Sequence, residues 1–490
     1  MHDSGGAESP VKIFANIFIS FVGAGVLGLP FAFKEAGILE GTIIMVFVAV
    51  VSVKAMLLLI DCKYKLEERK DVQRLFKVTS AAQHSEEKEE LLTKEENGVT
   101  EREQTTHIEV KVNGQLHQEK IDIENPDREK ILKEIDYGDV GYYALGQKGK
   151  TLVDASIIIS QIGFCCAYLI FISNNLASVI HGSHMFHWIS VMLPPLAVLC
   201  MLKHLNKLAI FSLFADFANI FAYSVVFWFD FEHIHSVRIH PKAMSLDGFP
   251  FFLGIAFYCF EGAGLILTLE SSVIATKRTL FRKLFIVALS IVTTLYVAFG
   301  VCGYTSFGPH TNGIITLNLP QGIFPLLVKS CLCFSLFFTY PVMMFPVNNI
   351  LERTLIPNPA TQTYISRTLR SGIVLLTGVI VVAIPNFTTL MALVGATCCT
   401  LLAFILPGIF HMRIFKDTIT FKMWVFDVLL ILLGILATII GTWDALKRMF
   451  PSLDSTSTLE AVTQSSVLPD AVAAVAAAAT ADLHTNATVL

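Results

Sequence analysis

Charged side chains are scarce in this sequence. Only 16% of its 490 residues are Asp, Glu, Lys or Arg, against about 25% in a typical soluble domain. The charges are also concentrated, because residues 61–140 hold 21 of the 40 acidic and 14 of the 36 basic residues. With 54% hydrophobic residues, the rest of the chain cannot form the surface of a soluble protein. The composition predicts a polytopic membrane protein.

Cysteines are missing from the positions where a disulfide framework would place them. Nine of the ten lie inside apolar runs, and Cys62 lies at the end of one. Adjacent cysteines such as Cys165 and Cys166 lack both the C-x-x-C spacing and the nearby histidines of a metal site. We therefore expect packing cysteines, with no disulfide framework and no metal bound by cysteine.

Signals for secretion and for catalysis are missing as well. The first ten residues are polar, and the first apolar run is too long for a cleavable signal peptide and has no cleavage site. The sequence contains no recognisable nucleophile–base set and no cofactor fingerprint. It does not predict an enzyme.

What the sequence does contain is a series of long apolar runs. A helix needs about 20 apolar residues to cross a membrane, and by that measure we predict an all-α protein with eleven transmembrane helices. They cover residues 12–33, 37–60, 151–180, 186–202, 208–229, 248–269, 281–303, 321–346, 369–385, 387–410 and 423–446.

Lysine and arginine are distributed unevenly between alternate loops. Twelve lie on one side of the predicted helices, and three, Lys34, Arg238 and Lys242, lie on the other. Because cytoplasmic loops carry the excess of positive charge, we predict a cytosolic N-terminus over residues 1–11. An odd number of helices then places the tail, residues 451–490, outside the cell or in a lumen. The membrane part comprises residues 12–60 and 141–450.

The charged insert, residues 61–140, is therefore predicted to be cytoplasmic. It is poor in aromatic residues, so it cannot bury enough apolar surface to fold alone, and we expect it to be disordered. Within it, Glu87, Leu91 and Leu92 resemble an acidic dileucine sorting signal for lysosome-like compartments. Such a signal would bind a sorting adaptor, although short patterns of this kind also occur by chance.

The first apolar run contains a stretch that does not suit a continuous helix. Residues 23–30 read Gly-Ala-Gly-Val-Leu-Gly-Leu-Pro, and glycine and proline inside a helix cost about 1 and 3 kcal/mol relative to alanine. Backbone groups freed in hydrocarbon cost several kcal/mol unless they face a cavity or a ligand. A break at membrane depth therefore suggests a binding site. The alternative is that these glycines only allow helices to approach closely.

A second interrupted segment favours the binding site. Residues 257–264 read Phe-Tyr-Cys-Phe-Glu-Gly-Ala-Gly, with a carboxylate at the depth of two glycines. Glycine-interrupted segments at corresponding positions of two halves indicate the central site of a secondary transporter. Together the two segments favour a transporter over a passive helical bundle.

These residues resemble the amino acid/auxin permease family, and within it the plant vacuolar and animal proton-coupled amino acid transporters. The resemblance lies in four stretches of the membrane part, namely Phe14–Lys34, Ser160–Phe171, Phe260–Glu270, and Gly303–Gly308 with Leu317–Pro320. It covers neither the insert nor the tail.

The resemblance implies an eleven-helix transporter. Its first ten helices would form a five-plus-five inverted repeat similar to the bacterial leucine transporter, with helices one and six starting the repeats. It also implies amino acid transport, commonly coupled to protons, across plasma, vacuolar or lysosomal membranes. One position departs from the family: animal proton-coupled members carry a histidine in the first helix where this chain has Asn16, which cannot titrate.

An amino acid needs donors for its carboxylate and acceptors for its ammonium group. Broken helices supply both, through half-helix N-termini and unwound carbonyls. The predicted substrate-binding residues contribute backbone groups at Gly23, Ala24, Gly25, Val26, Phe260, Glu261 and Gly262. The side chains of Tyr168, Phe257 and Phe260 would read the substrate side chain, or simply pack.

Two carboxylates are candidates for proton coupling. Glu261 lies near the predicted centre of the bilayer, where a charge is expensive and by default functional. It could carry the proton, or it could brace the break by accepting backbone N–H bonds. Asp216 in the fifth helix is the second candidate, and the alternative for it is a hydrogen bond that holds helices together. Ser335 and Thr339 could offer oxygens to a coupling cation such as sodium, or could bond within their own helix.

Histidines gather in two predicted outer loops. His181, His184 and His187 are spaced by three, and His233, His235 and His240 occupy the next outer loop. Such spacing can bind zinc, and histidines facing an acidic lumen can sense pH. Solvated loop histidines are more common than either, so the sequence does not predict a metal site.

The sequence thus predicts a secondary amino acid transporter that works by alternating access. Proton coupling, neutral amino acids and a vacuolar or lysosomal membrane are expected, ahead of a plasma membrane. One rival is a sodium-coupled symporter, and another is a receptor that binds an amino acid and signals through the insert. A third is a metal transporter that uses the outer histidines.

Overall fold

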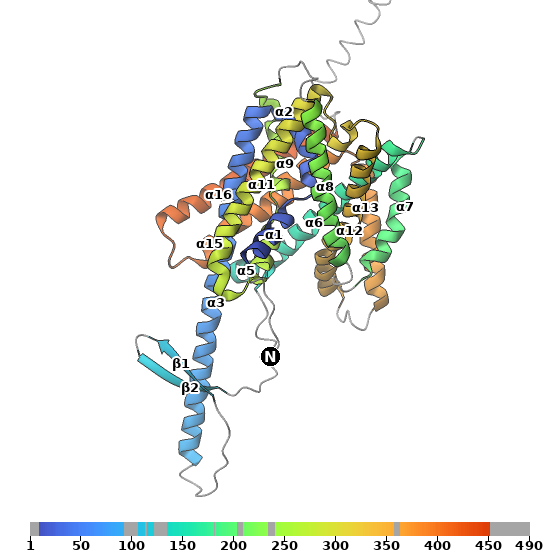
Figure 1. Cartoon of the computed structure of the whole chain (residues 1–490). Coiled ribbons are helices and arrows are strands. Elements are labelled where there is room, and N and C mark those ends of the chain that lie inside the picture. The colour runs from blue at the N-terminus through green and yellow to red at the C-terminus, as the bar shows by residue number, and fades with distance from the viewer. Residues whose placement is uncertain are drawn as a thin grey trace, which may run out of the picture.

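The computed structural model describes residues 9–92, 106–112, 115–121, 135–180, 182–202, 209–233, 241–356 and 363–450. Nearly all of this part is helical (Figure 1). Its strands form one antiparallel hairpin, in which β1 (Thr106–Val112) pairs with β2 (Gln115–Ile121) so that Thr106 faces Ile121. The membrane part is therefore all-α, as predicted.

Two of the apolar segments are broken helices. The first consists of α1 (Pro10–Phe21), the 3-10 helix η1 (Ala24–Gly28) and α2 (Leu29–Ala36), with a bend of 43° at the break. The second consists of η3 (Leu246–Gly248), α9 (Phe249–Cys259) and α10 (Ala263–Ser271). Both interruptions lie at the glycine-rich stretches from which the sequence predicts them.

The remaining helices account for the other apolar segments. They are α3 (Ile38–Leu92), α5 (Tyr137–Leu145), α6 (Gln147–Val179), α7 (Met185–Cys200), α8 (Ala209–His233), α11 (Arg278–Phe307), α12 (Ile323–Leu355), α13 (Thr363–Ala383), α14 (Phe387–Val394), α15 (Leu406–Ile414) and α16 (Phe421–Met449). The turns η7 (Gly395–Cys399) and η8 (Leu401–Ile405) are π-helical and join α14 to α15. Short 3-10 helices are η4 (Ala275–Lys277), η5 (Gly308–His310) and η6 (Ile315–Asn318).

Membrane spans can be counted only for the described residues. Eight helices there are long and apolar enough to cross a membrane, and the bent pair α1 with η1–α2 makes a ninth. Two further predicted segments correspond to α7, which has only 16 residues, and to α8, where several side chains lie outside the described part. The count of eleven spans and the inverted repeat stay predictions.

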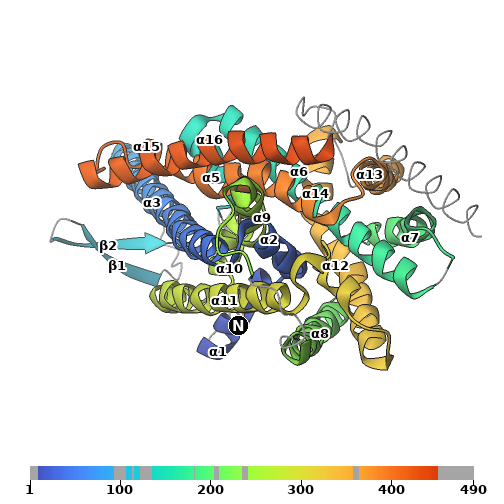
Figure 2. The same ribbon diagram turned by 90° about the horizontal axis from the view of Figure 1, so that it is seen from above.

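The upper half of the second broken helix lies in the centre of the bundle. Every residue of α9 from Phe251 to Cys259 is buried, and α9 contacts α2, α3, α14 and α16 (Figure 2). A Cβ added at Gly395 would lie 1.9 Å from the carbonyl oxygen of Gly254. The backbones of η7 and α9 therefore touch, and only glycine fits at this crossing.

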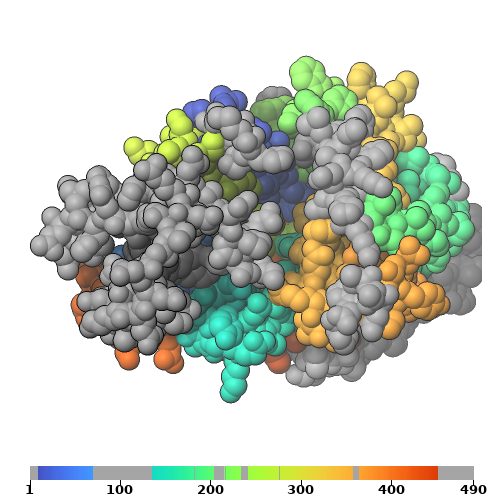
Figure 3. Space-filling view, turned by 90° about the horizontal axis from the view of Figure 1, so that it is seen from below, coloured from blue at the N-terminus to red at the C-terminus, as the bar shows by residue number. Residues whose placement is uncertain are grey.

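By contrast, α1 lies at the margin. Its principal neighbour is α11, beside which it appears in dark blue on the face of the molecule shown in Figure 3. Asn16, Ile19 and Ser20 of α1 are exposed.

The disorder predicted for residues 61–140 stays a prediction, because the structure describes only part of this range. The structure continues α3 as a helix through Leu92 and places the β1–β2 hairpin in this range. Lysine and glutamate favour helix and pair along it, as Lys65 and Glu68 do at 2.8 Å, so the helix extends beyond the packed bundle. Glu87, Leu91 and Leu92 fall at its end, where side chains lie outside the described part. The sorting signal stays a prediction.

A buried charge cluster fastens α10 to α3 and α11. Glu270 is fully buried and accepts a hydrogen bond from the ammonium of Lys63, which is 1% exposed. The hydroxyl of Tyr64 donates to the same carboxylate at 2.7 Å, and Arg278 pairs with it at 3.1 Å. Because an unpaired charge cannot be left in the interior at low cost, these contacts fix the lower half of the second broken helix.

We predict that Glu270→Gln lowers the free energy of unfolding by about 3–5 kcal/mol, the usual effect of removing one partner of a buried ion pair. Asp61→Asn is the matched control, because the pair of Asp61 with Arg282 is about one-third exposed and such pairs contribute about 0–1 kcal/mol. Thermal unfolding in detergent measures both. Equal losses in the two variants would contradict this assignment.

Candidate functional site at the two helix breaks

The two breaks lie against each other. The hydroxyl of Tyr296, on α11, donates to the carbonyl oxygen of Phe21 at the end of α1, and lies 3.4 Å from that of Cys259 at the end of α9. A Cβ at Gly25 would come within 2.9 Å of the Cys259 sulfur, and one at Gly262 within 2.2 Å of the Phe21 ring. One tyrosine hydroxyl therefore contacts the carbonyls at the ends of the first halves of both broken helices.

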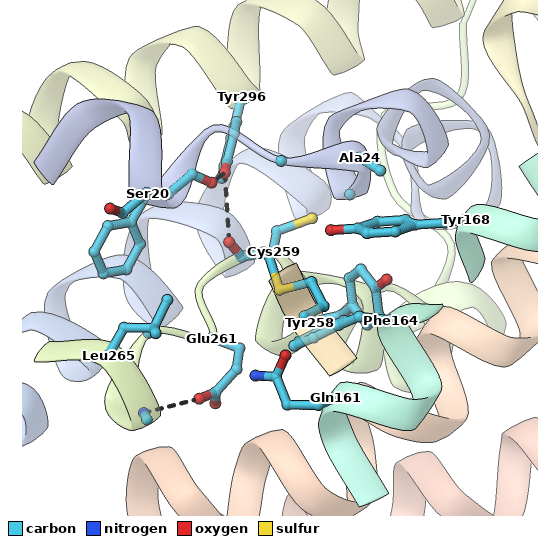
Figure 4. A pocket seen from close by; sticks show the side chains of 16 residues that line it. Ser20, Ala24, Gln161, Phe164, Tyr168, Tyr258, Cys259, Glu261, Leu265 and Tyr296 are labelled. Carbon is cyan, nitrogen blue, oxygen red and sulfur yellow. Dashed lines mark hydrogen bonds between the residues drawn. The ribbon is translucent and has the colours of Figure 1, made fainter. Parts of the chain in front are cut away.

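A small pocket opens beside this contact (Figure 4). Its cavity volume is about 70 Å³. It is lined by residues of the first break, of the second break, and of α6, α11 and α12, namely Ser20, Phe21, Gly23, Ala24, Gly25, Gln161, Phe164, Tyr168, Tyr258, Cys259, Glu261, Gly262, Gly264, Leu265, Tyr296 and Met343.

Backbone donors face this pocket from the first break. Gly23 has an extended backbone (φ −113°, ψ −171°) and precedes η1. A helix does not bond its first N–H groups internally, and in η1 these belong to Ala24 and Gly25, which both line the pocket. The start of η1, continued by α2, is thus suited to an anionic group.

The carboxylate of Glu261 serves the second break. One oxygen, Oε1, accepts the N–H of Gly264 at 3.3 Å in the first turn of α10. The other, Oε2, is buried and has no hydrogen-bond partner among the described residues. Glu261 can therefore stabilise the start of α10 with one oxygen and receive a proton or a cationic group with the other.

The wall formed by α6 and α9 is aromatic with polar tips. The rings of Phe164 and Tyr258 pack edge to face with their centroids 4.7 Å apart, and Tyr168 lies beside them (Figure 4). The Tyr258 hydroxyl and the Gln161 amide oxygen are buried and lack hydrogen-bond partners within the described part of the chain. The wall therefore offers apolar faces together with unused hydrogen-bonding atoms.

The pocket opens toward the side of α1 and α10. Among its 16 lining residues, Ser20 of α1 and Leu265 of α10 are exposed. The residues deeper along η1 and α9, such as Ala24, Gly25 and Tyr258, are buried.

Toward the α2 side the protein is packed shut. The rings of Phe31 and Phe251 meet edge to face, with their centroids 6.0 Å apart, and the Arg448 guanidinium lies 4.0 Å from the centre of the Phe251 ring. Arg448 also pairs with Glu35 at 2.9 Å, and the Lys34 ammonium donates to the carbonyl of Thr311 at 3.2 Å. These contacts join α2 to α9, α16 and the segment after α11.

The structure places six of the predicted substrate-binding residues on the pocket wall, namely Gly23, Ala24, Gly25, Tyr168, Glu261 and Gly262. Three others lie behind it. Val26 is fully buried in η1, Phe257 packs against Phe404 with their centroids 4.8 Å apart, and Phe260 packs against Tyr296. At the second break the pocket is lined by Tyr258, the residue after Phe257.

The other candidates lie apart from the pocket or outside the description. Asp216 belongs to α8, but its side chain is not among the described ones. Ser335 is buried on α12 without a partner for its hydroxyl in the described part, and Thr339 donates to the Ser335 carbonyl at 2.8 Å. Thr339 thus forms a hydrogen bond within its own helix, which is the alternative to a cation site.

The outer histidines are only partly described. His181, His235 and His240 lie outside the described residues, as does the side chain of His233. His184 precedes α7, and His187 contacts the ring of Trp188. Within the described residues no three His, Cys, Asp or Glu side chains come together as a metal site would require.

Sequence reasoning missed three polar residues of the pocket. Gln161 lies in a stretch that carries the family resemblance, and a polar residue in an apolar helix was the available signal for it. Tyr258 lies in the glycine-interrupted segment 257–264, where the prediction selected its neighbour Phe257 instead. Tyr296 gives no such signal, since one tyrosine in the apolar run of α11 looks like packing. Only the fold brings its hydroxyl to both breaks.

Comparison with known proteins identifies the family of this chain. A family model described as transmembrane amino acid transporter protein matches residues 6–81 and 124–447. The chain belongs to this family of amino acid transporters. Two relatives from Arabidopsis thaliana are amino acid transporter AVT3C, 32% identical over 466 residues with 90% of this chain and 92% of the relative covered, and amino acid transporter ANT1, 32% identical with 90% and 93% covered.

Membership confirms the resemblance noted from the sequence. It also confirms that the chain is a transporter rather than an enzyme, and that it is an integral membrane protein. The family match spans both broken helices and omits the region of the β1–β2 hairpin.

We predict that Gly262→Ala lowers the transport rate at least about tenfold, because the added methyl group forces the Phe21 ring to move, and such overpacking costs about 1–3 kcal/mol. Gly372→Ala on α13, away from the pocket, is the matched control, since a Cβ there has no atom within 4 Å among the described residues. Uptake in proteoliposomes at equal protein content measures both. A similar loss in both variants, or none in either, would contradict the packing described at the second break.

Proposed function

We propose that this chain is a secondary active transporter of neutral amino acids, coupled to protons, which binds its substrate between the two helix breaks. The observation that carries the proposal is the pocket at which free donors of η1 and an unused carboxylate oxygen of Glu261 meet. The relatives' names support an amino acid as the substrate.

The substrate's two charged groups fit different parts of this pocket. The carboxylate would accept hydrogen bonds from the N–H groups of Ala24 and Gly25 at the positive end of η1. The ammonium group needs acceptors, and the carbonyls around the break at Cys259 and the oxygen of Gln161 supply them. The substrate side chain would then lie against Tyr168 and Tyr258.

The coupling proton is proposed to bind at Glu261. Its Oε2 is buried at membrane depth without a partner in the described part of the chain, and an ionised carboxylate in such a place is expensive. Protonation, or the arrival of the substrate ammonium, relieves this cost. The proposal therefore gives Glu261 both roles that the sequence left open, with Oε1 as the brace and Oε2 as the proton site.

The asymmetry of the packing supports alternating access. The pocket is open beside α1, which has few neighbours, and shut beside α2. If the N-terminus is cytosolic, as the loop charges predict, this conformation faces the cytosol. The membrane is proposed to be vacuolar or lysosomal.

The test is uptake of a labelled neutral amino acid such as alanine into proteoliposomes with an imposed pH gradient. We predict accumulation in the wild type that collapses with a protonophore. In Glu261→Gln, accumulation should fall at least about tenfold while exchange of labelled for unlabelled substrate stays within about threefold, because the amide can still accept the Gly264 N–H but cannot titrate. Asp417→Asn, an exposed loop carboxylate, is the matched control.

Other outcomes point to the rivals. Uptake that requires sodium and ignores the pH gradient would overturn proton coupling and direct attention to Ser335, whose hydroxyl is free in the described structure. Substrate binding without flux under either gradient would overturn transport and favour a receptor. In that case the continuation of α3 beyond the bundle would be the candidate path of the signal.

A further inference from the structure

Among the buried carboxylates away from the pocket, Asp230 is the one with both oxygens unpartnered in the described part of the chain. Asp230 lies on α8, three residues before the helix ends at His233. Its side chain is fully buried, and neither Oδ1 nor Oδ2 has a hydrogen-bond partner among the described residues. Asp230 lies one residue beyond the predicted membrane segment 208–229, whereas Asp216 lies within it, so the sequence favoured Asp216.

A carboxylate cannot remain ionised in such a place without a large penalty. Burying a charge without a partner costs several kcal/mol or more, and the group takes up a proton instead. A neutral carboxylic acid loses far less on burial. The packing around Asp230 therefore suits the protonated acid.

The packing partners of Asp230 connect it with the first broken helix. A Cβ added at Gly303 of α11 would lie 3.4 Å from Asp230 Oδ2 and 2.6 Å from the ring of Pro30, at the start of α2. The hydroxyl of Ser306, one turn further along α11, donates to the carbonyl of Asp230. Asp230 is thus sealed where α8, α11 and α2 meet.

None of the described charged or titratable groups on α8 and α11 pairs with the Asp230 carboxylate. Glu232, two residues on, is exposed. On α11, the Cys302 thiol is close enough to interact electrostatically with Asp230 but supplies no positive charge. The hydroxyl of Tyr304 is engaged by the Lys242 N–H at 3.0 Å.

The charges on the other two neighbouring elements are engaged elsewhere. On α2, Lys34 donates to the Thr311 carbonyl and Glu35 pairs with Arg448. On the near half of α12, Lys329 donates to a serine of α6 at 3.1 Å. No cation in the described part of the chain therefore neutralises Asp230.

We propose that Asp230 is a proton-binding site that keeps the α2 side of the protein shut while it is protonated. The inference rests on alternating access as proposed above. Opening on that side must part α2 from α8 and α11, which admits water to Asp230 and lets it ionise. Protonation from that compartment then favours the shut state, in which the pocket opens beside α1. This proton binds from and returns to the compartment on the α2 side, so it is not transported. It is distinct from the proton assigned to Glu261.

The test follows the conformation directly and needs no substrate flux. Ser20→Cys places a thiol on the exposed rim of the pocket, and a membrane-impermeant maleimide labels it from the α1 side of vesicles in which the protein has one orientation. The pH on the α1 side stays constant while that on the α2 side falls from 8 to 5. Protein without Ser20→Cys gives the background from native cysteines.

In the protein that carries only Ser20→Cys, we expect the labelling rate to rise at least about threefold as the pH on the α2 side falls. One proton allows at most a tenfold change per pH unit. In Asp230→Asn, which imitates the neutral acid, labelling should be high and independent of pH. Glu232→Gln is the matched control and should keep the wild-type response.

Several results would overturn the proposal. They are labelling of the wild type that ignores pH, a pH response that survives in Asp230→Asn, or an Asp230→Asn protein that fails to fold. The last counts because the proposal predicts that the neutral amide fits this place, so at pH 8 this variant should unfold at a temperature no lower than the wild type. If labelling shows the expected pH response but no uptake is measured, the proton site at Asp230 is supported while the proposed transport function is not.

Discussion

The structure depends on how a membrane protein satisfies backbone groups where its helices are interrupted. Two broken helices meet at the centre of the bundle, and the Tyr296 hydroxyl holds the carbonyl of Phe21 while lying 3.4 Å from that of Cys259. Glu261 engages an N–H at the start of α10. What these side chains do not satisfy, the first N–H groups of η1 among them, faces a pocket. These unsatisfied groups form the proposed binding site.

The protein is packed more tightly on the α2 side of this pocket than on the α1 side. Such an asymmetry suits a transporter. On the α2 side, aromatic rings and the pair of Glu35 with Arg448 close the protein. On the other side, α10 is fixed by Glu270 to α3 and α11, while α1 rests mainly on α11. Of the two half-helices on the open side, α1 is therefore the freer to move, and α2 must move to open the shut side.

Much of this architecture could be predicted from the sequence, because apolar runs and glycine-rich interruptions are local signals. The breaks at Gly23 and Gly262 and the placement of Glu261 at the pocket follow from them, whereas Tyr168 lies in a stretch of α6 that carries the family resemblance. Which residues of a helix face the pocket is harder to predict, because it depends on contacts with other helices. Phe257 and Tyr258 are adjacent, and it is Phe257 that packs against Phe404 and turns away from the pocket. Roles that need contacts between distant segments, such as that of Tyr296, were beyond the sequence.

The central claim is that an amino acid binds between the two breaks. The most direct measurement is a structure determined with the best-transported neutral amino acid at saturating concentration. We predict ligand density between η1 and Glu261, with the carboxylate of the ligand within hydrogen-bond distance of the Ala24 and Gly25 N–H groups. Density at another site, or an empty pocket in a protein that binds the amino acid in solution, would contradict it.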